Sequence, residues 1–286
     1  MLFCSGLIMN LAAQKIEVKE PQLIKEAGTE AYYPKFTPDG KTIVLTSENY
    51  AGLKALSLET KKVEQLTSDL GAGWNLAISD DSKTAYFQKI DYSSDPWGYT
   101  SFHSVNLETR QIQHVMSPMT PSSTRPLLLM KSKAAIKSPV IVYASEELQL
   151  VVEKNGQKTV LTPNGADETY ILPQLSPDGK KIVYLASSME ETFICDLSGK
   201  ILTSLGRLHA PQWLNNDWVV GMNDWDDGHV VLKSNIIGIT ADGKVKQELT
   251  LSDGKIAMYP AASPAGDKIA FNTIDGKLYI MDIIVK

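Results

Sequence analysis

The chain has 286 residues, of which 43% are hydrophobic and 21% charged, and its formal net charge is −5. These proportions are typical of a globular protein with a substantial core, and the acidic balance excludes the basic surface that nucleic-acid binding requires. No apolar run reaches the roughly 18 residues of a membrane-spanning helix.

The chain begins with an apolar segment, MLFCSGLIMNLAA (residues 1–13), which turns polar at Gln14. Its apolar run and small-residue end are typical of a secretory signal, although the basic residues that normally precede them are missing. The alternative is a buried N-terminal strand, which Gly6 and Asn10 fit poorly. We therefore expect residues 1–13 to be a truncated signal peptide, and the protein to be periplasmic or otherwise exported.

A strand–turn–strand pattern centred on Pro-Asp-Gly-Lys recurs along the chain. Its clearest copies are YPKFTPDGKTIVLTS (33–47), LPQLSPDGKKIVYLAS (172–187) and YPAASPAGDKIAFNT (259–273). Weaker copies bring the number of units to six, spaced 38 to 50 residues apart and aligned on Pro34, Leu76, Pro126, Pro173, Pro211 and Pro260. A period of about 45 residues is typical of the four-stranded blades of a β-propeller.

Each unit has the pattern of an antiparallel sheet. Proline presets φ, aspartate bonds the local backbone and glycine accepts positive φ, so Pro-Asp-Gly between two apolar runs predicts a hairpin. In the fourth unit two further strands follow the hairpin, ending at ILTSLG (201–206). No segment shows sustained helical periodicity. We predict an all-β fold, a six-bladed propeller of four-stranded antiparallel blades.

The last unit ends at its third strand, in KLYIMDIIVK (277–286), and lacks a fourth. A spare strand stands before the first unit, in KIEVKEPQLIKEAG (15–28). We expect this strand to pair beside Leu278–Ile283 and close the ring, which hides two sheet edges that would otherwise invite aggregation. Residues 15–286 would then form a single domain.

The repeated pattern resembles that of the TolB-like propellers, a WD-repeat-like family in which Ser-Pro-Asp-Gly marks the first hairpin of each blade. The resemblance covers nearly the whole chain; it is clear in units one, four and six and degraded in the others, for example to SDDSK (79–83). It implies a fold but not a biochemical function, because such propellers include periplasmic partners of envelope complexes, domains of serine peptidases and sugar-acid lyases.

The resemblance also implies where a site would lie, because the first strand of each blade lines the central channel of a propeller. The residues just before the aligned positions should therefore surround the channel mouth: Tyr33, Asn75, Arg125, Leu172, Ala210 and Tyr259. Two tyrosines, an arginine and an asparagine would form a pocket for a polar or anionic group. The alternative is that a tyrosine before proline only covers the packing of its blade.

Two enlarged loops are expected on the same rim, where a rigid scaffold concentrates binding residues. One spans 90–103 and contains Trp97 and Tyr99; the other spans 221–229 and contains Trp225. Exposed aromatics there would favour a protein or glycan contact, and folding back onto the blades is the alternative.

The second loop also contains Asp224, Asp226 and Asp227, and calcium takes several such hard oxygen ligands. Their spacing differs from that of the calcium-loop motif and no bidentate glutamate follows. A solvated acidic turn is therefore the alternative to a calcium site.

Catalytic signatures are missing from the sequence, which has no Gly-x-Ser-x-Gly, His-Glu-x-x-His or paired-cysteine motif. Among four scattered histidines, His209 lies two residues before an aligned position, Pro211. Cys195 stands in an apolar strand pattern, and we expect a core side chain rather than a nucleophile.

These observations favour a non-enzymatic, monomeric propeller without a cofactor, which binds a protein or peptide of the cell envelope at the channel mouth. The alternative is a carbohydrate-active, lyase-like enzyme or a glycan-binding propeller. It would use the same mouth, with His209, His229, Arg125 and the acidic loop.

Overall fold

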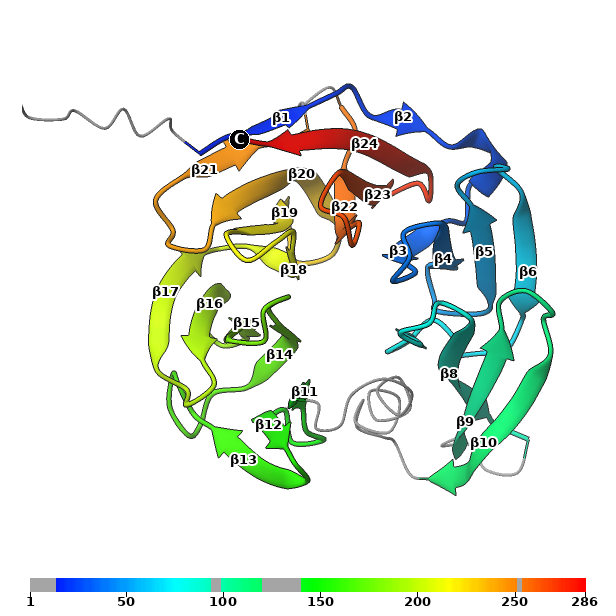
Figure 1. Ribbon diagram of the computed structural model, residues 1–286, viewed down its shortest axis with the longest axis horizontal. Helices are drawn as coiled ribbons and strands as arrows, with labels where there is room; N and C mark the ends of the chain where they lie inside the picture. Colours follow the sequence, from blue (N-terminus) through cyan, green and yellow to red (C-terminus); the bar gives the residue numbers. More distant parts are fainter. Residues whose placement is uncertain (1–13, 94–98, 120–139, 251–253) are drawn as a thin grey trace, which may run out of the picture.

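The computed structural model describes residues 14–93, 99–119, 140–250 and 254–286. Its strands form six antiparallel sheets, arranged as blades in a ring (Figure 1). The helical structure in the described residues is a single 3-10 turn, Lys25–Ala27. Within those residues no helix is long and apolar enough to cross a membrane. The predicted all-β, six-bladed propeller is confirmed.

The blades follow one another along the chain. Blade 1 contains β3 (Tyr32–Phe36), β4 (Thr42–Thr46), β5 (Leu53–Ser57) and β6 (Val63–Thr67), and blade 2 contains β7 (Ala77–Ile78), β8 (Thr84–Asp91), β9 (Tyr99–Asn106) and β10 (Ile112–Met119). Blade 3 contains β11 (Val140–Ala144), β12 (Leu150–Lys154) and β13 (Gln157–Leu161), and its expected first strand, at Pro126, lies outside the described residues.

The second half of the ring repeats this order. Blade 4 contains β14 (Tyr170–Leu175), β15 (Lys181–Ala186), β16 (Glu191–Asp196) and β17 (Ile201–Gly206), and blade 5 contains β18 (His209–Trp213), β19 (Trp218–Asp226), β20 (Val231–Thr240) and β21 (Lys246–Glu248). Blade 6 contains β22 (Ala257–Ala262), β23 (Lys268–Thr273) and β24 (Leu278–Val285), with β1 (Ile16–Val18) and β2 (Gln22–Leu23) along its outer edge.

The N-terminal strand closes the ring as the sequence predicted. β1 pairs with β24 so that Ile16 lies opposite Val285, and β2 pairs with the other half of the same strand. Ile16 is fully buried in the core between blades 5 and 6. The Gln247 side chain of β21 accepts a hydrogen bond from the Ile16 N–H (3.0 Å) and donates another to its carbonyl. The first strand is therefore held by both final blades.

The Pro-Asp-Gly hairpins share one hydrogen-bond arrangement. In blade 4, Ser176 Oγ donates to Asp178 Oδ1 (2.6 Å) and accepts from the Lys181 N–H (2.9 Å), while Gly179 takes φ +71°. The degraded SDDSK copy keeps this arrangement, because Ser79 Oγ bonds Asp81 and Ser82 adopts the positive φ (62°) in place of glycine. Ser/Thr and Asp thus carry the hairpin where the full motif is lost.

The inner strands contain a recurrent bulge. Five residues, each immediately before an aligned position, have φ between 46° and 56°: Tyr33, Asn75, Leu172, Ala210 and Tyr259. In blades 1, 4, 5 and 6 the pairing with the second strand shifts register at the same point. A bulge re-aims side chains and raises the local twist of a strand. The residues that the sequence assigned to the mouth therefore share a backbone state.

The apolar cores lie between neighbouring blades, and Cys195 is fully buried in one of them, between the sheets of blades 3 and 4. Burial raises the pKa of this thiol to about 12. Because the reactive species of cysteine is the thiolate, Cys195 is a core side chain, as expected.

Candidate functional site at the channel mouth

Tyrosines from the first and last blades meet at the mouth. The ring centroids of Tyr33 (β3) and Tyr259 (β22) are 4.4 Å apart, and Tyr33 stacks on Tyr50 at 4.3 Å. Tyr50 also meets the edge of Trp74 at 5.0 Å. These four side chains form one aromatic cluster, here called the mouth cluster, which joins blade 6 to blade 1 and to the segment that enters blade 2.

Burial determines the protonation state of the mouth cluster. It raises the pKa of Tyr33, and the hydrogen bond with Tyr50 raises it further. Burial likewise raises the pKa of Tyr50 and of Tyr259. The three phenols therefore remain protonated at neutral pH and present hydroxyl groups and aromatic faces. Trp74, which is 47% exposed, presents nearly half of its surface to solvent.

A histidine–aspartate pair lies beside this cluster. Nδ1 of His209, in β18, is 2.7 Å from Oδ1 of Asp224, in β19, and the side chains are 23% and 5% exposed. This carboxylate oxygen accepts no hydrogen bond from the described residues.

Asp224 is buried because of its place in β19. It continues the row of Trp218, Val220 and Met222, whose side chains pack in the core between blades 5 and 6. Its negative charge contributes to raising the pKa of Tyr259 in the neighbouring blade, after burial and the effect of Tyr33. His209, Asp224 and Tyr259 therefore form one electrostatic unit at the mouth.

The other two candidate calcium ligands point elsewhere. Asp226 approaches Arg207 (3.7 Å) and accepts the Gly228 N–H, while Asp227 accepts the N–H groups of His229 and Val230 in its own turn. No group of three or more His, Cys, Asp or Glu side chains in the described residues could hold a metal ion. The structure thus separates Asp224 from the two turn carboxylates, and a calcium site remains a sequence-based expectation.

The two enlarged loops are shorter than expected. β19 and β20 pair continuously from Trp218 to Asp226, and β8 and β9 pair out to Asp91 and Tyr99. Most of residues 221–229 are therefore strand, and Trp225 projects from the end of β19 with 57% of its surface exposed. Tyr99 is also exposed. Trp225 is therefore not folded back onto the blades.

The remaining predicted residues have different outcomes. Asn75 takes the bulge conformation at the entry to β7, next to Trp74 in the chain. Asparagine is among the residues that tolerate this conformation best. Trp97 and Arg125 lie outside the described residues. The structure therefore unites Tyr33 with Tyr259, and His209 with Asp224, within the predicted set.

Sequence reasoning missed Tyr50 and Trp74. Tyr50 lies in the loop between the second and third strands of blade 1, and Trp74 in the segment that enters blade 2. Both segments belong to the mouth rim by the rule that located Tyr33. An aromatic residue in either of these two segments could have been recognised as a candidate from the sequence. Its contacts with side chains of a neighbouring blade could not.

Exposed apolar side chains are concentrated on the mouth rim. More than half of the exposed large apolar residues in the described chain lie on or beside its loops, including Leu70, Trp74, Leu172, Met189 and Trp225. The others lie on strands at the outside of the ring, such as β10, β13 and β17. Among the described residues, none of them lies in the turn of a Pro-Asp-Gly hairpin. Exposed apolar side chains on one rim make that rim a candidate interaction face.

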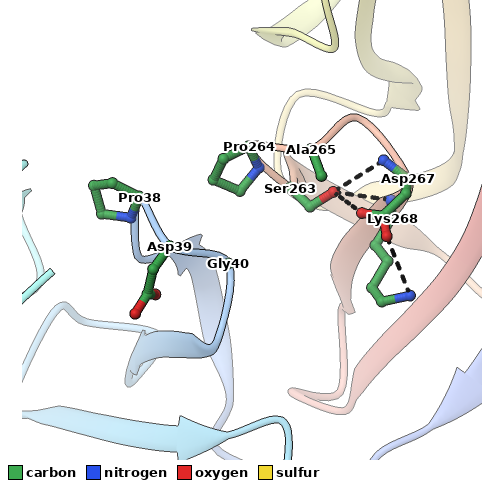
Figure 2. Close-up of a pocket in the computed structure, with 8 residues that line it drawn as sticks. All are labelled: Pro38, Asp39, Gly40, Ser263, Pro264, Ala265, Asp267 and Lys268. Carbon is green, nitrogen blue, oxygen red and sulfur yellow. Dashed lines mark hydrogen bonds and ion pairs between the residues drawn. The ribbon is translucent and has the colours of Figure 1, made fainter.

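A shallow hollow of about 410 Å³ lies on the opposite rim, between the hairpins of blades 1 and 6 (Figure 2). Figure 2 shows that its polar groups are bonded among themselves: Ser263 Oγ donates to Asp267 (2.7 Å) and accepts from the Lys268 N–H. Lys268 Nζ also lies 2.7 Å from Asp282. Because these groups satisfy one another, the hollow is a seam between blades rather than a site with polar groups directed at a ligand.

No family model matches the chain, and no curated protein matches it in sequence. Solved structures do match. TolB from Acinetobacter baumannii has a TM-score of 0.56 at 21% identity, covering 80% of this chain and 56% of TolB. An oligogalacturonate lyase from Vibrio parahaemolyticus has a TM-score of 0.51 at 13% identity, and the match covers 94% of this chain and 97% of the lyase. The tricorn protease has a TM-score of 0.56 at 15% identity, and the match covers 90% of this chain and 26% of the protease.

The fold and the mouth define the class of protein: the chain is a six-bladed β-propeller with an aromatic and acidic channel mouth. In its fold it is a TolB-like propeller, as the repeat indicated. The chain spans about half the length of TolB and about a quarter of the tricorn protease. At identities this low the likeness shows the fold alone.

Proposed function

We propose that this protein is an exported, non-enzymatic propeller of the cell envelope, which binds a protein or peptide partner at the channel mouth. The observation that carries this proposal is the mouth cluster of Tyr33, Tyr50, Trp74 and Tyr259, which joins two blades and presents Trp74 to solvent. Aromatic side chains dominate the energetic centres of protein interfaces.

Three further observations support the proposal. The exposed apolar side chains are concentrated on the same rim. The apolar segment 1–13 is typical of a secretory signal. The fold is shared with TolB, and the repeat resembles that of periplasmic partners of envelope complexes. Export would place the chain where such a partner is found.

The test is affinity capture from an envelope extract with two single-site variants that remove equally exposed side chains. Trp74 and Leu202 are both 47% exposed, the first at the mouth and the second on the outer strand β17. We expect one protein to be retained by the native chain and by Leu202→Ala and to be lost with Trp74→Ala. In calorimetry the same protein, once purified, should bind the native chain and Leu202→Ala but not Trp74→Ala. If Trp74→Ala retained this protein as well as the native chain does, the channel mouth would not be the binding site.

A second candidate function, a lyase-like activity on sugar acids, is favoured by the His209–Asp224 pair. A half-buried histidine whose Nδ1 lies 2.7 Å from a buried carboxylate is an arrangement suited to general-base catalysis. In such a reaction the base would remove the proton α to the sugar carboxylate and the glycosidic oxygen would leave with its electron pair, forming a carbon–carbon double bond. Oligogalacturonate is the probe, since the propeller from Vibrio parahaemolyticus is an oligogalacturonate lyase.

The absorbance of the unsaturated product would report turnover. Turnover that is lost in His209→Ala would establish this activity in place of a purely binding role. No turnover, combined with partner binding that depends on Trp74, would leave the binding proposal alone.

A further inference from the structure

The mouth cluster lies in a negatively charged sector of the rim. The carboxylates of Asp224 and Glu48 both act on Tyr259: after burial and the effect of Tyr33, they raise its pKa further. Glu48 acts in the same way on Tyr33, which burial and Tyr50 affect more strongly. Two carboxylates, one buried in β19 and one exposed in the loop before Tyr50, therefore flank the aromatic side chains.

The cations near this sector are engaged with other groups. Arg207 contacts Glu190 at 3.0 Å and Asp226 at 3.7 Å, and Lys35 Nζ donates to the carbonyl of Leu76 in blade 2. His209 contacts Asp224 but is charged only when it is protonated. Within the described chain, neither Asp224 nor Glu48 forms an ion pair with a lysine or an arginine. Among the described residues, these two carboxylates therefore lie beside aromatic faces without a lysine or arginine paired to them.

Aromatic faces and carboxylates together favour one kind of ligand group. A lysine ammonium or an arginine guanidinium is attracted to the face of Trp or Tyr, and more strongly when it is partly desolvated. A neighbouring carboxylate adds a charge-assisted hydrogen bond. Trp74 and Glu48, both exposed, are accessible to such a group, while Asp224 is a buried carboxylate near Tyr259.

We propose that the partner presents a lysine or arginine side chain to the sector formed by Trp74, Tyr50, Tyr33, Tyr259, Glu48 and Asp224. This inference rests on the proposed function, and it names the chemistry of the partner segment. It differs from the expectation of a pocket for a polar or anionic group, in which the positive charge would come from Arg125, a residue outside the described chain. The occupant is a cationic peptide segment.

The experiment selects peptides from a random library on the native protein and removes those that also bind Trp74→Ala. The remaining peptides depend on the mouth. One of them is then synthesised with its lysine or arginine and, separately, with neutral norleucine or citrulline at that position. Dissociation constants are measured by fluorescence anisotropy for the native chain, for Glu48→Gln, and for the matched control Glu59→Gln. Glu59 is an exposed glutamate of the same blade, on the opposite rim.

We expect the mouth-dependent peptides to be enriched in lysine and arginine. The neutral analogue should bind about tenfold more weakly, and Glu48→Gln should weaken binding by about threefold while Glu59→Gln leaves it unchanged. Binding should also weaken with added salt. Because Glu48 is exposed, its substitution is expected to leave the fold intact.

Two results would overturn the inference in different ways. Mouth-dependent peptides that have no cationic bias, or whose neutral analogues bind equally well, would refute the inference and leave the proposed function standing. A selection that gives no peptide dependent on Trp74 would count against both the inference and the peptide-binding function.

Discussion

Tyr33 and Tyr259 face each other across the seam where the ring closes, with their ring centroids 4.4 Å apart. Tyr33 belongs to the first blade and Tyr259 to the last. The Tyr33 N–H also donates to Oδ1 of Asn272 in blade 6, at 3.1 Å. The candidate binding site is thus built on the closing contact of the propeller, so that the side chains proposed for recognition also contribute to stability.

The first prediction concerns the energy of this contact. Tyr33→Leu and Tyr259→Leu should each destabilise the fold, and the double variant should lose about 0.5–1.5 kcal/mol less than the sum, because the ring–ring interaction is removed only once. Urea unfolding of the four proteins measures this coupling. Tyr33→Leu combined with Tyr86→Leu, in blade 2, is the control and should be additive. Additivity of the first pair would show that the contact has no specific energy.

The second prediction concerns the bulge. Ala210 adopts φ +46°, a conformation that costs a residue with a Cβ about 1–2 kcal/mol. Ala210→Gly should therefore raise the free energy of unfolding, by about 1 kcal/mol, despite the greater flexibility of glycine in the unfolded chain. The matched control is Ala262→Gly, in the inner strand β22, which has an ordinary φ and should be destabilised. Equal effects in both variants would contradict the strain argument.

The third prediction concerns closure of the ring. Gln247 bonds both the N–H and the carbonyl of the buried Ile16, so Gln247→Ala leaves two backbone groups without their partner. The free energy of unfolding should fall by about 1–3 kcal/mol. Gln247→Glu keeps an acceptor for the N–H but loses the donor to the carbonyl. Its free energy of unfolding should therefore lie between those of the native chain and Gln247→Ala. Lys246→Ala, at the exposed neighbouring position, should have little effect in the same urea titration.

The repeat made the fold predictable, together with the positions of two of the four side chains in the mouth cluster. Each unit has its own hairpin and inner strand, so the positions of Tyr33 and Tyr259 followed from the alignment alone. The mouth cluster was not predictable as a unit, because the contacts of Tyr50 depend on how neighbouring blades are placed. A single sequence defines the strands of a blade more directly than the contact between two blades.

The acidic segment shows a different limit. Trp218, Val220 and Met222 alternate in a way that points Asp224 inward, yet Asn and Asp are depleted in strands, which favoured a loop from Gly221 onward. The structure continues β19 through Asp224 because the long partner strand β20 pairs with it residue by residue. The burial of Asp224, and hence its contact with His209, depends on that pairing rather than on the local sequence.

The fourth prediction concerns pH and the cross-strand pair of His103 and His114 in blade 2, whose ring centroids are 5.2 Å apart. Burial lowers the pKa of His103 below its ordinary value of about 6.5, and positive charge on His114 lowers it further. As the pH falls through about 6.5, the unfolded chain binds a proton at this residue that the folded chain does not. The free energy of unfolding should therefore decrease on acidification, until the pH reaches the lower pKa of the folded state.

Urea unfolding between about pH 7.5 and pH 5.5, a range above the usual carboxylate pKa values, measures this slope. His103→Gln removes the titrating group and should flatten the slope. His114→Gln should only reduce it, because burial, the larger cause, remains. A slope that is unchanged in His103→Gln would assign the pH dependence to another group. A slope abolished by His114→Gln would reverse the order of the two causes, making the neighbouring charge more important than burial.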